Sequence, residues 1–191
     1  MPRSIKELTG VDEDLKPARS MRVRQQTIEY LRHLGCVFTN GRRICVIDPF
    51  LDPASQSYKE IPQLLLAARN RNPQPCLEIH RKCNYKPQGE RERPITLENE
   101  WRAIFRLWNE QFDRAGLRVE IRIWDEFHNR YFLSEILGLH VGKGFIASRN
   151  PRAIDAWSRL SRDDRVKVDR EFDENNSPDH QLWCRFSIGA V

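Results

Sequence analysis

Apolar residues recur along the chain with two different periods. A spacing of three to four residues, typical of amphipathic helices, occurs in three segments: 19–34, 55–70 and 96–115. Alternating or continuous apolar runs, typical of strands, occur in five: 35–40, 44–47, 75–83, 117–127 and 182–188. The stretch 127–145 predicts one or two further strands. A short helix is expected at 4–10 and a charged, broken helical segment at 150–174.

Local signals support several of these boundaries. Gly35 and Gly116 suit the carboxyl ends of the first and third helices, because glycine favours the position after a helix. Thr96 is expected to cap the third helix, and Pro62 to lie near the start of the second. Asn40–Gly41 is a strong turn signal.

The order of these elements favours one fold class. Strands that alternate with amphipathic helices are typical of an α/β layered domain with a mostly parallel or mixed sheet. A length of 191 residues suits one domain. We therefore expect residues 1–39 to form a small helical N-terminal segment and residues 40–191 to form the main domain.

The charge balance bears on the choice of partner. The formal net charge is +5 and the sequence pI is about 9.1. Such a balance favours polyanionic partners such as nucleic acid or an acidic membrane surface. A mildly basic pI is also common in proteins that bind neither, so the charge alone does not choose between these interpretations.

The cysteines and the termini indicate a cytoplasmic protein. Five cysteines are present, and no pair has the C-x-x-C spacing of a zinc site. An odd number of free thiols fits a reducing compartment better than a disulfide framework. The first twenty residues have no apolar core, so we expect no signal peptide, and no window suits a membrane span.

The segment 127–145, FHNRYFLSEILGLHVGKGF, carries the strongest candidate site. His128 and Arg130 are two residues apart, and on a strand both side chains would share one face. A histidine beside a guanidinium can hold or attack a phosphoryl group. Gly142 and Gly144 permit tight backbone geometry around an anion, and Lys143 adds a positive charge.

This segment resembles the motif of the phospholipase D superfamily. That motif is His-x-Lys, four residues, Asp, six residues, and Gly-Ser-x-Asn. The spacing is kept, but the residue types differ at four of the six positions. The positions fall on His128, Arg130, Glu135, Gly142, Lys143 and Phe145.

The sequence is most similar to a variant of that superfamily, the phospholipase-D-like domain of MIT-domain proteins and their bacterial relatives. "FHNRY", "GLHVGKGF" and the strand "VIDPFLD" at 46–52 carry the likeness, which covers residues 40–148. It implies a mixed sheet flanked by helices. In an active member, His128 would be the nucleophile, with Arg130 and Glu135 in the catalytic set. Active members use two such motifs, from one chain or from a dimer.

Three functions follow as hypotheses. The first is a phosphodiester-binding module, with nucleic acid the expected ligand and Arg130, Gly142, Lys143 and Gly144 binding phosphate. The second is a metal-independent nuclease that dimerises to bring two His128 residues together. The third is a scaffold that docks on an anionic membrane or a partner protein. No metal and no small-molecule cofactor is expected. A subunit of a larger bacterial system, such as a defence system, is a plausible setting.

Other polar residues allow more than one interpretation. His80 and Lys82 repeat the His-x-Lys spacing, but Pro87 and Pro94 stand where the motif needs Asp and Gly, so we interpret that match as coincidence. His140 could join the site or be structural. Lys86 and the segment 91–94 form a basic loop that could touch phosphate or simply be solvated.

Acidic and aromatic residues leave similar choices. Asp48 and Asp52, at the end of the strand 44–47, could bind a metal, but capping a turn and starting the next helix is the favoured interpretation. Trp124 could stack on a base or pack in the core. The helical stripe that contains Trp101, Trp108 and Phe112 predicts core packing.

Overall fold

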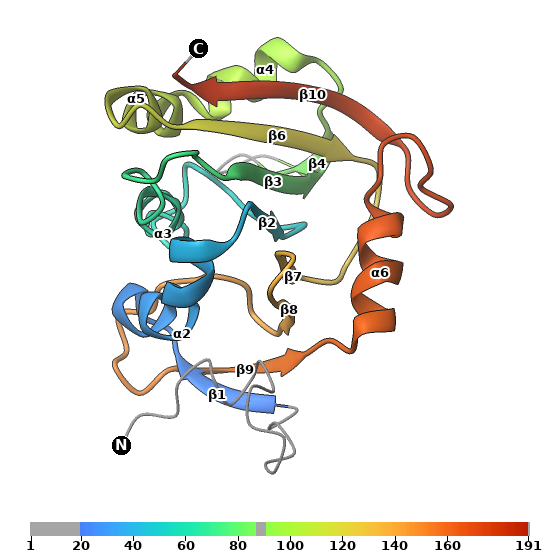
Figure 1. Ribbon diagram of the computed structural model, residues 1–191. Helices are drawn as coiled ribbons and strands as arrows, with labels where there is room; N and C mark the ends of the chain where they lie inside the picture. Colours follow the sequence, from blue (N-terminus) through green and yellow to red (C-terminus); the bar gives the residue numbers. More distant parts are fainter. Residues whose placement is uncertain (1–19, 87–90, 191) are drawn as a thin grey trace.

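The computed structural model describes residues 20–86 and 91–190 and shows a mixed α/β protein (Figure 1). An eight-stranded sheet has the order β1-β9-β8-β7-β2-β3-β6-β10. The helix expected at 4–10 lies outside the described residues. The expected fold class, an α/β protein with a mixed sheet, is confirmed at this level.

Three parallel strands form the centre of the sheet. They are β2 (Arg43–Ile47), β3 (Cys76–Lys82) and β6 (Arg118–Trp124). β3 pairs in parallel with β2 on one side and with β6 on the other. Their apolar side chains are buried because helices cover both faces; the apolar residues of β2 form a continuous run, and those of β3 and β6 alternate with polar residues. All three strands were predicted from these patterns.

Antiparallel strands extend the sheet on both sides. β7 (Tyr131–Leu133) pairs with β2, and β8 (Gly138–Val141) follows it as a hairpin. β9 (Ile154–Arg159) and β1 (Ser20–Arg24) complete that side. On the other side, β10 (Leu182–Gly189) pairs with β6. The separate short strands β4 (Asn84–Tyr85) and β5 (Arg93–Pro94) form a small ribbon.

The helices divide unequally between the two faces (Figure 1). One face carries the main apolar core beneath four helices: α2 (Thr27–Asn40), α3 (Ile61–Leu66), α4 (Glu98–Ile104) and α5 (Arg106–Arg114). The other face packs on α6 (Arg162–Glu171), where Val168 and Phe172 meet a smaller cluster that includes Cys45 and Trp124. Trp101, Trp108 and Phe112 are core residues, as predicted.

The N-terminal region differs from the prediction. Residues 20–24 form β1, and the helix runs through Gly35 to Asn40 instead of stopping at Gly35. The residues expected to form a strand at 35–40 are the last turns of this helix. The buried positions of α2 are Tyr30, Leu34, Val37 and Phe38. This stripe crosses Gly35, and burying it outweighs the helix-breaking tendency of one glycine.

The same region changes the domain description. β1 pairs with β9, and α2 packs against the main core, so residues 20–40 belong to the same sheet-and-helix unit as residues 41–190. The expected boundary at residue 40 does not correspond to a break in this unit.

Residues 150–174 were expected to form a charged, broken helical segment, but the first part is β9. Ile154–Arg159 pairs with both β1 and β8. Pairing between segments that are distant in the sequence cannot be recognised from the local pattern of apolar residues. Ser161 caps α6, since its hydroxyl accepts a hydrogen bond from the Asp164 N–H. The helix therefore begins only at Arg162.

Two other helices are shorter than predicted. The segment 55–70 contains only α3, with Pro62 in its first turn as expected. The segment 96–115 is broken at Phe105 into α4 and α5, and the cap is Leu97 instead of Thr96. All five cysteines are free thiols. Among residues 20–86 and 91–190, no helix has the length and apolar character needed to cross a membrane.

Candidate functional site

One edge of the sheet gathers the polar residues that follow the central strands. β2, β3 and β6 are parallel, so their carboxyl ends meet at this edge. Asp48 follows β2, Lys82 ends β3 and Glu126 follows β6. β7 runs antiparallel to β2, so its preceding residue, Arg130, reaches the same edge. Carboxyl ends of parallel strands are a common place for sites in α/β proteins.

Arg130 is held in place by three contacts. Its Nε donates to Asp48 Oδ1 at 3.2 Å and its Nη1 donates to the Gly142 carbonyl at 3.0 Å. The guanidinium carbon lies 4.7 Å from the centre of the Phe50 ring. Nη2 has no hydrogen-bond partner among the described residues. The guanidinium is therefore oriented, with one nitrogen left to bind another group.

Asp48 is a buried carboxyl group at the base of this arrangement. It is 1% exposed, and burial raises its pKa to about 6, although Arg130, the Phe50 N–H and the Tyr58 hydroxyl act in the opposite direction. Within the described residues, its Oδ2 atom is buried without a hydrogen-bond partner. Oδ1 accepts from the Phe50 N–H, so Asp48 caps a turn, as favoured from the sequence.

The glycine-rich segment covers this ion pair. Gly144 has a φ of +75°, and a side chain there would collide with Asp48 Oδ2 and approach Arg130 Cδ to 3.1 Å. Gly142 lies against Asp155, whose Oδ1 would be 2.7 Å from an added Cβ. Glycine is therefore needed at both positions, because backbone packs directly on polar side chains.

The backbone donors of this segment are already used. The Lys143 N–H donates to both carboxylate oxygens of Asp155, at 3.0 and 2.9 Å, and the Gly142 N–H donates to the Ala156 carbonyl. These two amides therefore do not form an anion-binding loop in this structure. The Lys143 side chain is exposed and makes no ion pair within the described residues.

A cluster that we call the edge cluster surrounds the exposed ring of Phe50. Lys82 Nζ lies 4.8 Å from the ring centre and 3.1 Å from Glu126 Oε1. His128 Nδ1 lies 3.8 Å from the same Glu126 oxygen. The edge cluster consists of Asp48, Phe50, Lys82, Glu126, His128 and Arg130.

His128 is not on a strand, contrary to the expectation. It lies in the connection between β6 and β7, and its side chain is 77% exposed. The apolar residue before it, Phe127, is buried and anchors the connection against α6. Arg130 directly precedes β7, so the two residues reach the same edge but do not share a strand face.

Glu135 lies at the opposite edge of the sheet. It follows β7, and its carboxylate accepts hydrogen bonds from the Arg42 and Arg43 N–H groups at the start of β2, the second at 3.2 Å. The structure therefore does not bring Glu135 to His128. Phe145, at the last motif position, is a core residue packed against Tyr30 and Trp157.

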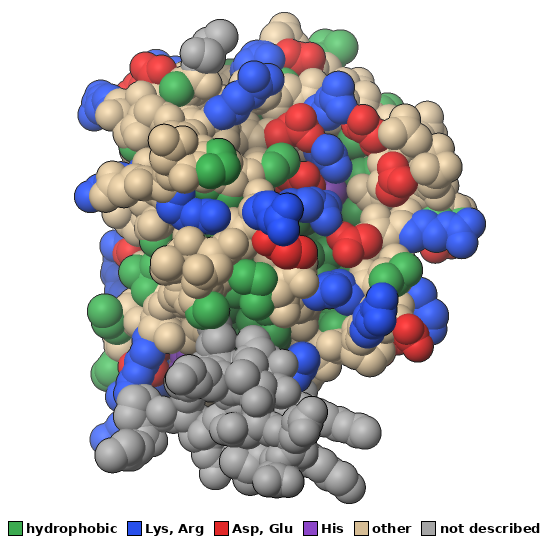
Figure 2. All heavy atoms as spheres, in the orientation of Figure 1, with side chains coloured by type: hydrophobic (Ala, Val, Ile, Leu, Met, Phe, Trp, Pro, Cys, Tyr) green, Lys and Arg blue, Asp and Glu red, His purple; other side chains and the backbone are tan. Residues whose placement is uncertain are grey.

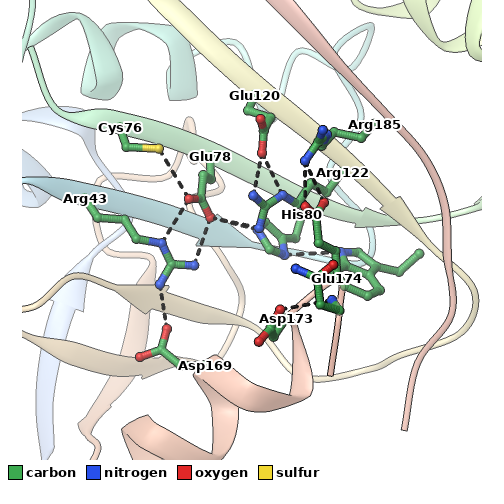
Figure 3. A network of polar contacts seen from close by, with 12 residues as sticks. Arg43, Cys76, Glu78, His80, Glu120, Arg122, Asp169, Asp173, Glu174 and Arg185 are labelled. Carbon is green, nitrogen blue, oxygen red and sulfur yellow. Dashed lines mark hydrogen bonds and ion pairs between the residues drawn. The ribbon is translucent and has the colours of Figure 1, made fainter. Parts of the chain in front are cut away.

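A second set of polar residues lies on the sheet face covered by α6 (Figure 3). Arg43 donates from Nε and Nη2 to the two oxygens of Glu78, at 3.0 and 2.8 Å, and from Nη1 to Asp169 at 2.6 Å. Arg122 lies 3.5 Å from Glu78 and also pairs with Glu120. Burial would raise the pKa of Glu78, but hydrogen bonds from His80 and Arg43 outweigh it and keep that pKa well below its usual range.

His80 belongs to this buried network, which comprises Arg43, Glu78, His80, Arg122 and Trp124. Trp124 Nε1 can only donate, and it lies 3.1 Å from His80 Nδ1. Nδ1 is therefore the acceptor, and Nε2 carries the proton that it donates to Glu78 at 3.2 Å. Burial lowers the pKa of His80 and keeps the ring neutral. Trp124 is fully buried, as its core interpretation predicted.

The donor atoms of Cys45, Glu78 and His80 lie within 4.8 Å of one another. They do not fit a metal ion. The Nε2 atom of His80 holds a proton, and burial raises the pKa of the Cys45 thiol. Neither residue therefore offers a free deprotonated ligand atom. Arg43 and Arg122 already neutralise Glu78, and a cation would be repelled by both guanidinium groups.

The remaining candidates are dispersed. Asp52 caps a turn through the Ala54 N–H and accepts a hydrogen bond from the Tyr85 hydroxyl, but no helix starts there. His140 packs on Tyr131 within the sheet, and no contact between its side chain and the edge cluster occurs in the described residues. A pocket of about 210 Å³ adjoins Phe50. It is lined by Pro49, Phe50, Asp52, Arg81, Lys82, Asn84, Tyr85, Lys86 and Glu92.

Sequence reasoning missed Phe50, Glu126 and the role of Lys82. Each follows or ends a central parallel strand, so its position at a strand's carboxyl end was the available signal. Lys82 was set aside together with His80, and both are buried, but Lys82 is the last residue of the strand. Lys82 ends at the edge beside Glu126.

Comparison with known proteins finds similarity among solved structures alone. No protein-family model and no curated protein matches the chain. The chain is similar to TrmBL2, an archaeal chromatin protein whose structure shows a novel mode of DNA binding, with 12% identity and a TM-score of 0.40. The match covers 86% of this chain and 55% of that one. A likeness of this size carries no argument about function.

Proposed function

We propose that this protein is a phosphodiester-binding module of the phospholipase-D-like type and that its ligand is nucleic acid. The observation that carries the proposal is the convergence of Lys82 and Arg130 on Phe50 at one edge of the sheet, with an exposed His128 beside Glu126, the partner of Lys82. An oriented guanidinium and an exposed imidazole, with the ammonium of the largely buried Lys82 close to the same ring, suit the oxygens of a phosphodiester.

Two features of Arg130 support a binding role. Asp48 and the Gly142 carbonyl fix the plane of the guanidinium, so little side-chain freedom is lost when a ligand binds. The free Nη2 can then donate to a phosphate oxygen. Lys143 lies in the glycine-rich segment, and its side chain is exposed. This residue and the net charge of +5 add attraction for a polyanion.

Binding is favoured over turnover for a structural reason. A histidine nucleophile needs a neighbour that orients its ring and a second group that protonates the leaving oxygen. Glu135 lies at the other edge, and the group within ion-pair distance of His128 is Glu126, which also pairs with Lys82. The nuclease alternative keeps one supporting observation, because a 77% exposed His128 is open to a substrate and to a second subunit.

The membrane or protein scaffold is less well supported. On the face shown in Figure 2, Lys and Arg side chains are interspersed with Asp and Glu. Docking on an anionic bilayer favours clusters of several basic residues with few acidic ones among them. We therefore place nucleic acid first.

The test is a binding titration with labelled single- and double-stranded DNA and RNA over a range of salt concentrations. We expect the affinity to fall steeply as salt rises, and Arg130→Ala to weaken binding by about tenfold, which is about 1.4 kcal/mol. Arg114→Ala is the matched control, since Arg114 is 79% exposed at the end of α5, away from the edge cluster. Equal effects of the two substitutions, or no binding at all, would overturn the proposal.

The same proteins are incubated with nucleic acid in the presence and absence of EDTA. Binding without cleavage, largely retained in His128→Ala, is the result expected for a binding module. Cleavage that survives EDTA and disappears in His128→Ala would replace the proposal with the nuclease alternative and would require a dimer.

A further inference from the structure

A second pocket lies beside the segment that continues from the glycine-rich motif. Its volume is about 470 Å³. Three parts of the chain line it: Gln25 after β1, residues 56–60 before α3, and Ile146–Arg149. None of these residues belongs to the edge cluster.

The walls of this pocket are tied together by backbone hydrogen bonds. The Ser148 N–H donates to the Gln25 carbonyl at 2.9 Å, and the Ala147 N–H donates to the Ser57 carbonyl at 2.9 Å. The Tyr30 hydroxyl donates to the Ile146 carbonyl at 2.8 Å. Because all three lining segments are joined in this way, the pocket is preformed.

Gln25 points to a ligand. The residue is 6% exposed, and its main chain is bonded to Ala153 and Ser148. Its side-chain carboxamide, which has two donor hydrogens and an acceptor oxygen, makes no hydrogen bond with the described residues. The fully enclosed side-chain atoms without a partner in the described residues are those of His33, Asp48 and Asp125, so the Gln25 carboxamide keeps access to solvent. A carboxamide that lines a pocket without a partner therefore suits a polar ligand.

The other lining groups define what kind of ligand this is. Arg149 is exposed and forms no ion pair within the described residues, and Lys59 lies 3.7 Å from Glu60. Gln56 adds a second carboxamide, and Ile146 adds apolar surface. A nucleobase offers paired donors and acceptors on its edge and apolar faces, and carboxamides match such edges. The attached phosphate would be met by Arg149 and Lys59.

We propose that this pocket receives one nucleotide, with Gln25 and Gln56 bonding the base edge and Arg149 and Lys59 the phosphate. A volume of about 470 Å³ is within the range of ligand pockets that enclose small molecules. Because the nucleotide would be part of a nucleic-acid chain, this inference rests on the proposed function and sharpens it. A base enters a pocket only when it is unpaired, so the ligand would be single-stranded nucleic acid.

The test compares base preference with overall affinity. Wild type and variants are titrated with four single-stranded homo-oligonucleotides, with a duplex, and with the four free nucleoside monophosphates. We expect wild type to prefer one base. Gln25→Ala should weaken the preferred oligonucleotide by about fivefold, the effect of one or two hydrogen bonds, and remove the preference. Gln63→Ala, an exposed glutamine on α3, is the matched control.

Variants of the edge cluster separate this inference from the proposed function. Arg130→Ala should weaken all oligonucleotides equally and keep the base preference. Oligonucleotide binding that depends on Arg130 but shows no loss of preference in Gln25→Ala would overturn the pocket and leave the proposed function in place. If a free nucleotide binds base-selectively and needs Gln25, but no oligonucleotide binds, the pocket inference would stand and the proposed function would be overturned.

Gln25 is buried, so Gln25→Ala could unfold the protein. Gln56→Ala and Arg149→Ala change exposed residues and test the same inference. We expect the first to reduce base preference and the second to reduce affinity for free nucleoside monophosphates but not for nucleosides. Unchanged binding in both variants would overturn the inference.

Discussion

The edge cluster and the buried network contain the same kinds of residue in opposite states. Each has histidine, arginine and a carboxylate in contact. In the buried network, both nitrogens of His80 are bonded, and Glu78 is shared by two arginines. In the edge cluster, His128 is 77% exposed, and Arg130 keeps one nitrogen free of partners among the described residues.

This difference separates structure from function. A polar group whose hydrogen bonds are all made inside the protein has no donor or acceptor left for a ligand. Its role is to satisfy the buried ion pairs around it. A group that is oriented but incompletely bonded can bind at little further cost.

The largest expected effect tests whether the buried network is structural. Glu78→Gln removes the charge that neutralises Arg43 and Arg122 while keeping the shape of the side chain. We expect a loss of about 3 kcal/mol in the free energy of unfolding, because two partly buried guanidinium groups each lose one of two counter-charges, Asp169 and Glu120 remaining. Urea denaturation at pH 7 measures it.

Glu98→Gln is the control for that experiment. Glu98 forms an exposed pair with Arg102 within α4, and its loss should change the free energy of unfolding by less than about 1 kcal/mol. If the two substitutions had equal effects on stability, the buried network would not be the structural element that we describe. Nucleic-acid binding by folded Glu78→Gln protein should be unchanged.

The second effect tests the buried carboxyl group of the edge cluster. The pKa of Asp48 is raised to about 6 from an unfolded value of 3.8, so the folded state binds the extra proton between these pH values. Stability from this group is therefore present at low pH and is lost as the pH rises from about 4 to 6, by roughly 2 to 3 kcal/mol.

Asp48→Asn removes this titration. The variant should gain stability relative to wild type by that amount between pH 4 and pH 8, which urea denaturation at several pH values would show. Asp52→Asn is the control, since Asp52 lies in the same connection and caps its own turn. Parallel stability curves for wild type and Asp48→Asn would contradict the assignment.

The smallest effect concerns Lys82. Lys82→Met keeps the apolar stem beside Phe50 but removes the charge. We expect binding of single-stranded nucleic acid to weaken about threefold and its salt dependence to fall by about 0.7 in slope, the change for one phosphate contact. Lys167→Met, on the exposed side of α6, should change neither quantity. An unchanged slope would remove Lys82 from the binding surface.

Much of the fold could be predicted from short-range pattern. β2, β3, β6 and β10 each carry enough apolar residues in a row or in alternation to be recognised alone. β1 and β9 could not, because SMRVR and IDAWSR are short and have polar residues at half or more of their positions. They are strands because they pair with each other, and that pairing joins residues more than a hundred positions apart.

The site divides in the same way. The sequence by itself determined that His128, Arg130 and the two glycines would lie close along the chain, and that Gly142 and Gly144 would serve a close backbone approach. Only the tertiary structure decided that Arg130 meets Asp48 and that Glu135 faces the other edge. The reason is that β7 runs antiparallel to β2, so the two ends of one short strand reach opposite edges of the sheet.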